Sequence, residues 1–84
     1  MTQRREARAY AALEPVRKAY PIAVSKDDVY AHLVATFGIR KATAVEDVDS
    51  VVDLGWLRWD GLRPGHLVFG PRAPVEIRRR EGSA

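Results

Sequence analysis

A single change of sequence period, at Gly55, limits what this chain can fold into. Before it, from Thr43 to Leu54, apolar residues recur at helical spacing. After it, from Trp56 to Phe69, apolar and aromatic residues form two short runs typical of strands, with a polar loop between them. Glycine itself adopts the left-handed backbone that closes a helix. The stretch therefore predicts a helix that ends at Gly55 and continues at once into a β-hairpin.

The predicted helix before Gly55 has its own start signal. Thr43 and Glu46 match the Ser/Thr-x-x-Glu capping box, so we expect the helix to begin at about Ala44. Valines at helical spacing predict its buried face, which consists of Val45, Val48 and Val52 with Val51 beside them. The opposite, solvent-facing side is predicted to carry Glu46, Asp49, Ser50 and Asp53.

The predicted hairpin needs a loop longer than two residues. Asp60-Gly61 matches a tight two-residue turn, but Pro64 would then lie inside the returning strand, where it cannot donate to the ladder. A loop over residues 60–65 resolves this conflict, with Pro64-Gly65 making a turn of its own. The two strands are then predicted at 56–59 and 66–69.

Two more helices are predicted upstream. The first covers residues 2–20 and places Tyr10, Leu13, Val16 and Tyr20 at helical spacing. Pro15 interrupts this pattern, because a proline inside a helix loses a hydrogen bond at a cost of about 3 kcal/mol. Two alternatives follow: the helix kinks at Pro15, or it splits there, with the proline at the first position of a second piece.

The second predicted helix follows a short apolar run at 22–24, which we expect to form a brief strand. Ser25 is its expected N-cap, with Asp28 completing an approximate capping box. Gly38 is its expected C-terminal stop. A stripe of buried residues is predicted along it: Val29, Tyr30, Leu33, Val34 and Phe37.

The resulting order of helix, strand, helix, turn, helix and hairpin over roughly residues 7–70 resembles the winged helix-turn-helix superfamily. The resemblance rests on element order alone. It implies an α+β, mostly helical fold of three helices with a short β-hairpin wing, in one domain over residues 1–77. Within that range, residues 75–77 are expected to add a marginal edge strand. Residues 78–84 form a basic tail that we expect to be mobile.

In function, the resemblance implies a small transcriptional regulator or accessory factor that binds double-stranded DNA. In such domains the third helix enters the major groove and the wing contacts the neighbouring backbone. The charge distribution agrees at the two ends of the chain, since residues 1–20 and 58–84 each sum to +3. By position, the residues expected to contact DNA are Lys26, Arg40, Lys41, Thr43, Arg58, Arg63 and His66.

The acidic side of the third helix favours an alternative function. Glu46, Asp49 and Asp53 place three carboxylates where a DNA groove would lie, and duplex DNA carries one negative charge per roughly 1.7 Å. The same face suits a basic protein partner, which would make the domain an adaptor or assembly component. It is equally compatible with a solvated helix face that has no partner.

Several other classes of function are not expected. The chain has no cysteine, so disulfides and thiolate zinc sites are excluded, and we expect no metal and no cofactor. It lacks a glycine-rich phosphate loop and a Gly-x-Ser-x-Gly elbow, so we do not expect an enzyme. No apolar run approaches a membrane span, so we expect a cytoplasmic protein with no membrane partner. Homodimerisation through the first helix is a further expectation.

Overall fold

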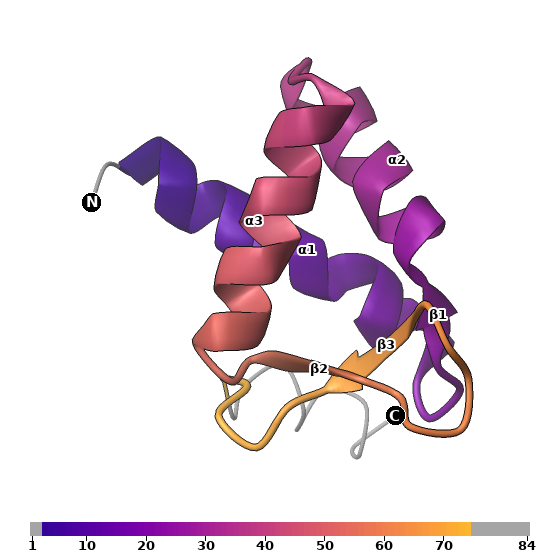
Figure 1. Cartoon of the computed structure of the whole chain (residues 1–84). Helices are drawn as coiled ribbons and strands as arrows, with labels where there is room; N and C mark the ends of the chain where they lie inside the picture. Colours follow the sequence, from indigo (N-terminus) through magenta and orange to yellow (C-terminus); the bar gives the residue numbers. More distant parts are fainter. Residues whose placement is uncertain (1–2, 75–84) are drawn as a thin grey trace.

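The computed structural model describes residues 3–74 as three helices and a small three-stranded antiparallel sheet (Figure 1). This is the predicted α+β, mostly helical fold with the layout of a winged helix. Its elements, in chain order, are α1 (Gln3–Ala19), β1 (Val24–Ser25), α2 (Lys26–Phe37), α3 (Lys41–Asp53), β2 (Leu57–Trp59) and β3 (His66–Phe69). The edge strand predicted at 75–77 and the basic tail at 78–84 lie outside the described residues. Between residues 3 and 74, no helix has the length and apolar character needed to cross a membrane.

Helix α1 passes through Pro15 without a break, which excludes the split and leaves the other alternative, a single helix that contains the proline. Leu13 and Val16 are buried as their spacing predicts. Tyr10 and Tyr20, at the ends of the same pattern, remain 42% and 52% exposed. Each packs one ring face at the edge of the core: Tyr10 lies 5.0 Å from Trp56 between ring centroids, and Tyr20 lies 5.9 Å from Phe69. The aromatic ends of the stripe therefore cover the rim of the core while the aliphatic middle fills it.

Both predicted ends of helix α2 are confirmed. The Ser25 hydroxyl oxygen accepts a hydrogen bond from the Asp27 backbone N–H at 3.2 Å, as an N-cap does. Gly38 adopts φ 66°, and its N–H donates to the Val34 carbonyl oxygen at 2.9 Å. Strand β1 is displaced from the predicted 22–24 to Val24–Ser25, because the chain pairs with β3 only there.

Helix α3 begins at Lys41, so the predicted start at Ala44 with Thr43 as N-cap is wrong. Arg40 occupies the N-cap position in an extended conformation, and its side chain makes no capping hydrogen bond within the described chain. The Ala44 N–H instead donates to the Arg40 carbonyl oxygen at 3.0 Å, inside the first turn. Thr43 therefore lies inside the first turn, and the residues that follow it include Ala44 and Asp47 in the interior, at 0% and 7% exposure.

The inward face of α3 is also rotated from the prediction. Its buried residues are Ala44, Asp47, Val48 and Val51. Val45 and Val52 are only partly buried, at the edge of that face. The predicted stop at Gly55 is confirmed, with φ 80°, and the Trp56 N–H donates to the Val51 carbonyl oxygen at 3.1 Å to close the last turn.

The sheet has the order β1-β3-β2, and β2 and β3 form the predicted hairpin. Its loop is the predicted long one. Asp60 Oδ1 accepts from the Leu62 N–H at 3.0 Å, and the His66 N–H donates to the Arg63 carbonyl oxygen at 3.1 Å. The second bond closes a four-residue turn with Pro64 second and Gly65 third, at φ 77°, as a type II turn requires.

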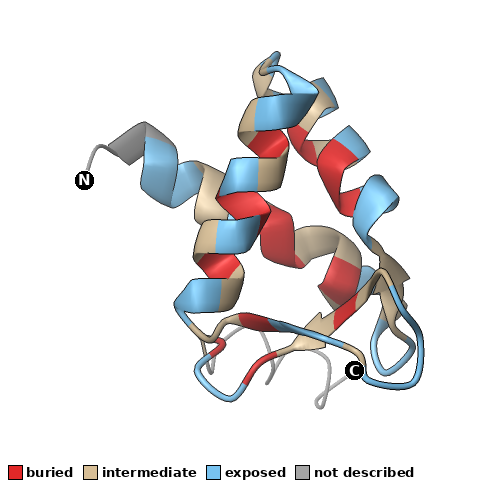
Figure 2. Ribbon diagram, viewed as in Figure 1, coloured by how far each residue is buried: buried red, intermediate tan, exposed pale blue. Residues whose placement is uncertain are grey.

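The core lies where the three helices meet above the sheet, and the buried positions in Figure 2 fall on the inward sides of all three helices. It is small and mainly aliphatic, consistent with a domain of this length. Its buried cluster comprises Ala12, Leu13, Val16, Val29, Tyr30, Leu33, Ala44, Val48, Val51, Leu57 and Leu67.

Candidate interaction surfaces

The residues predicted to contact DNA lie at three separate places. The first is the start of α3, where Arg40 and Lys41 are exposed and Thr43 is partly buried in the first turn. This end of α3 adjoins the end of α2, and the hairpin lies at the opposite end of α3 (Figure 1). A helix of 13 residues is about 20 Å long, so this group is separated from the wing by roughly that length.

The second place is the junction between the wing loop and the start of α2. The Lys26 backbone N–H donates to the Gly65 carbonyl oxygen at 2.9 Å, which fixes Lys26 beside the loop that carries Arg63. Lys26 and Arg63 are exposed there. His66 is half-buried, and its Nδ1 lies 3.2 Å from the Pro64 carbonyl oxygen, to which it donates in the Nδ1-protonated tautomer. The His66 ring is therefore already in polar contact with the backbone of the wing turn.

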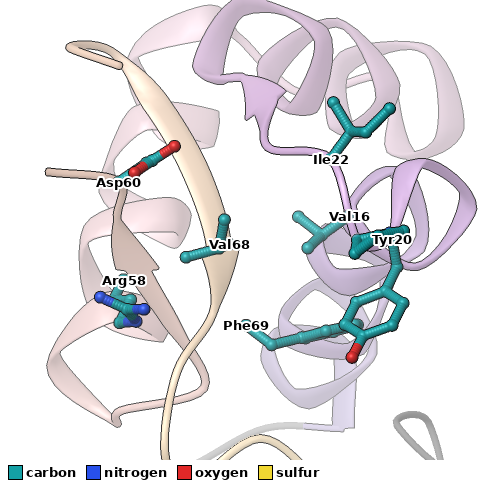
Figure 3. Close-up of a pocket in the computed structure, with 8 residues that line it drawn as sticks. Val16, Tyr20, Ile22, Arg58, Asp60, Val68 and Phe69 are labelled. Carbon is teal, nitrogen blue, oxygen red and sulfur yellow. The ribbon is translucent and has the colours of Figure 1, made fainter. Parts of the chain in front are cut away.

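The third place is a groove of about 300 Å³ between the end of α1 and the hairpin, where Arg58 lies. Figure 3 shows Val68 of β3 on the side of this groove opposite Val16, while the Phe69 ring reaches over to Tyr20. Arg58 is on the neighbouring strand, paired with Val68 in the register of the sheet. The full lining is Val16, Tyr20, Pro21, Ile22, Arg58, Asp60, Val68 and Phe69. Arg58 therefore belongs to the sheet surface and not to the wing tip.

A different groove lies between α2 and α3, with a volume of about 330 Å³. We call it the α2–α3 groove. Aliphatic or aromatic side chains of α2 form most of it, and one charged residue comes from the first turn of each helix. Its lining residues are Asp27, Tyr30, Ala31, Val34 and Lys41.

Tyr30 is the most buried residue of this groove, at 7% exposure. Burial raises the pKa of Tyr30 above its ordinary value, and the carboxylates of Asp49 and Asp27 raise it further. These two acids belong to different helices and are 22 residues apart in the sequence. Both are therefore close enough to raise the pKa of the same phenol, although only Asp27 lines the groove, where Lys41 carries the opposite charge.

The acidic residues of α3 differ sharply in their surroundings. Glu46, Asp49 and Asp53, which were predicted to face a protein partner, are all exposed. Asp47 is 7% exposed and forms a two-pronged ion pair with Arg8 of α1. The Arg8 Nε donates to Asp47 Oδ2 at 2.6 Å, and Nη2 donates to Oδ1 at 3.3 Å. Asp47 is thus a structural link between α1 and α3, and the other three acids are available to a partner.

The buried ion-pair role of Asp47 was not predicted, although the spacing of its neighbours in the sequence indicates that it is buried. Asp47 lies three residues after Ala44, one before Val48 and four before Val51, which puts it on a continuous helical stripe. A carboxylate on an apolar stripe needs a cationic partner when it is buried. The α2–α3 groove had no comparable signal, since its lining comes from two helices whose relative placement the sequence does not state.

Neither a metal centre nor a known relative adds to this picture. Among residues 3–74, no three histidine, aspartate or glutamate side chains are grouped so that they could hold a metal ion. Comparisons with protein-family models, with curated protein sequences and with solved structures found no match to the chain. Evidence for the function therefore comes from the charged surfaces and grooves described above.

Proposed function

We propose that this protein is a winged-helix interaction module that binds a basic segment of a protein partner on its α2–α3 face. The observation that carries the proposal is the apolar groove lined by Asp27 and Tyr30, with Asp49 of α3 close enough to raise the pKa of the Tyr30 phenol. A cationic side chain placed there is attracted by two carboxylates, and its aliphatic stem contacts the apolar lining. Glu46 and Asp53 extend the acidic surface along the exposed side of α3.

The same surface is a poor match for the DNA major groove. In the winged-helix arrangement the third helix is the one that enters the groove. Here its exposed side carries Glu46, Asp49 and Asp53, against a ligand with one negative charge per roughly 1.7 Å. The cations that would compensate, Arg40 and Lys41, are confined to one end of the helix.

Reversing the acidic face distinguishes a protein ligand from DNA. We expect the triple variant Glu46→Lys, Asp49→Lys and Asp53→Lys to lose its protein partner while it keeps the fold, since all three side chains are exposed. For a DNA ligand, the same reversal should instead raise affinity for mixed-sequence duplexes. Duplex affinity is measured by fluorescence anisotropy at several salt concentrations. The neutral variant Glu46→Gln, Asp49→Asn and Asp53→Asn is the matched control and should lie between the wild type and the reversal.

Photo-crosslinking identifies the partner class directly. A photoreactive amino acid at Ala31, in the α2–α3 groove, should yield a protease-sensitive adduct in the cells that make this protein. The same group at Ala7, exposed on α1, is the control for chance contacts. The adduct from Ala31 should disappear in the triple reversal variant. A nuclease-sensitive adduct from Ala31 would contradict the proposal.

A second candidate function, duplex DNA binding at the wing, is favoured by the Lys26–Gly65 hydrogen bond. That bond holds the start of α2 against the wing turn, two residues along the chain from Arg63, at the end of the molecule away from the start of α3. If DNA binds here, Arg63→Ala should weaken duplex binding and reduce the salt slope by about one unit. Arg72→Ala, at an exposed arginine outside the wing, is the control. Duplex binding that is absent at low salt would rule out this second function.

A further inference from the structure

We infer that the α2–α3 groove accommodates an amphipathic, basic α-helix of two to three turns from a partner protein. The inference rests on the proposed function and adds the shape, length and direction of the bound segment. Four features of the groove support it: the elements that line it, its length, the Tyr30 hydroxyl and the opposite charges at its ends.

The elements that line the groove favour a helical ligand over an extended one. All five lining residues belong to α2 or α3. The backbone N–H and C=O groups inside a helix are bonded to one another, so such walls offer little to a strand. An extended segment would leave its own backbone polar groups unpaired against Ala31 and Val34. A helix pairs its backbone internally and presents only side chains, as helix-in-groove ligands do.

The length of the groove sets the length of the ligand. Its lining on α2 runs from Asp27 to Val34, seven residues apart, which is about 10 Å along the helix axis. Two turns of a second helix cover the same distance. Apolar side chains four residues apart on that helix are separated by about 6 Å and would both contact the groove lining.

Tyr30 indicates a cation among the ligand's side chains. Among residues 3–74 its hydroxyl has no hydrogen-bond partner, and because no described side-chain oxygen is both buried and unpaired, this hydroxyl is accessible at the surface of the groove. A hydroxyl so placed accepts a hydrogen bond from a lysine or arginine of the ligand, and Asp27 and Asp49 are close enough to stabilise the same cation. An apolar helix without cations would cover the Tyr30 hydroxyl without offering it a hydrogen bond.

The charges at the two ends of the groove give the ligand a direction. Asp27 lies at the start of α2, and Lys41 lies at the start of α3, near the end of α2. A helix carries partial positive charge at its N-terminus and partial negative charge at its C-terminus. The bound helix should therefore place its N-terminus near Asp27 and its C-terminus near Lys41.

The probe for this inference is a labelled synthetic peptide of leucine and lysine with an apolar stripe at positions i, i+4 and i+7. Its control is an isomer of the same composition in which the leucines are redistributed so that no stripe forms. We expect the striped peptide to bind at least tenfold more tightly in fluorescence anisotropy and to gain helical circular dichroism on binding. Equal affinity for the two isomers would overturn the helical inference, since charge alone would then explain binding.

Two substitutions locate the binding. Ala31→Arg places a bulky cation in the groove and should weaken the striped peptide at least tenfold, whereas Ala7→Arg on α1 adds the same charge elsewhere and should have little effect. Tyr30→Phe removes only the hydroxyl and should weaken binding about tenfold or more, as expected for one hydrogen bond to a charged group. Equal effects of Ala31→Arg and Ala7→Arg would overturn the assignment to the groove.

Failure of this inference is distinguishable from failure of the proposed function. If both isomers bind equally and both are lost in the triple reversal variant, the acidic face binds basic segments but not specifically helices. If neither peptide binds, the inference is overturned, and the crosslink from Ala31 separately decides the proposed function. A crosslink from Ala31 to a second copy of this chain would overturn both, because it would identify the groove as a dimer interface.

Discussion

Helices α2 and α3 begin with similar sequence signals, but only one of the two signals is used. Ser25 caps α2 through the Asp27 N–H, as its sequence predicts. Thr43, followed by Glu46 in an even closer match to the capping box, lies inside the first turn of α3. The difference is in what surrounds each start. Ser25, just before α2, is held in strand β1 and paired with His66 of β3, whereas no described strand includes the residues at the start of α3.

The capping residue of α2 thus lies where the strand ends and the helix must begin, whereas nothing comparable stops α3 from starting three residues before its predicted first residue. A side-chain cap contributes about 1 kcal/mol. Leaving Asp47 without Arg8 would cost more than that, because a buried carboxylate without a cation is strongly unfavourable. The ion pair therefore stabilises the packing of α3 on α1, and Asp47 belongs to α3 whichever residue begins the helix.

The largest predicted effect tests that ion pair. Asp47→Ala should lower the free energy of unfolding by about 3 kcal/mol, because it leaves the half-buried Arg8 guanidinium unpaired. Asp49→Ala, two residues along the same helix but exposed, is the matched control and should change it by less than about 0.5 kcal/mol. Urea unfolding followed by tryptophan fluorescence measures both. Equal effects of the two substitutions would show that the Arg8–Asp47 pair contributes no more to stability than an exposed carboxylate does.

The next effect tests the cap that is used. Ser25→Ala removes the acceptor for the Asp27 N–H and should lower the free energy of unfolding by about 1 kcal/mol. Ser25→Asp supplies another acceptor at the same position and should retain most of the stability. If Ser25→Asp were as destabilising as Ser25→Ala, the loss would have to come from strand β1, which also contains this residue.

A smaller effect is expected at Thr43. Because Thr43 lies inside the helix, Thr43→Ala removes no cap, and alanine has the higher helix propensity. The free energy of unfolding should change by less than about 0.5 kcal/mol in the same urea measurement. A loss as large as that of Ser25→Ala would mean that Thr43 caps α3 in solution, as the sequence alone suggests.

The sequence predicted those parts of the fold that depend on neighbouring residues. The stops at Gly38 and Gly55, the cap at Ser25 and the Pro64-Gly65 turn all depend on local backbone geometry, and all are confirmed. The start of α3 and the α2–α3 groove depend on contacts between residues far apart in the chain. The separation of the basic residues also depends on such long-range contacts. Lys41 and Arg63 were both predicted to contact DNA, yet they lie at opposite ends of the molecule.

The exposed acidic side of α3 was predicted, but the presence of an acid from α2 near the same tyrosine was not. Glu46, Asp49 and Asp53 are exposed on one side of α3, as helical spacing requires. That Asp27 of α2 joins Asp49 at Tyr30 follows only from how the two helices pack. The surface proposed to bind a basic protein partner therefore includes residues of α2 and an apolar groove, in addition to the acidic side of α3.

The smallest predicted effect concerns the ionisation of Tyr30 and tests whether Asp27 and Asp49 both act on its hydroxyl. Burial, Asp49 and Asp27 raise the pKa of Tyr30, so the neutral phenol is favoured in the folded state. The resulting stabilisation is fully present below the unfolded pKa of about 10 and is lost as pH rises through the higher folded pKa. The phenolate absorbance that disappears in Tyr30→Phe reports this ionisation. Asp49→Asn should lower the pKa of Tyr30 more than Asp27→Asn does, since Asp49 has the stronger influence. A titration that neither substitution moves would mean that the two carboxylates do not meet at Tyr30, and the groove would then lack the charge on which a basic ligand depends.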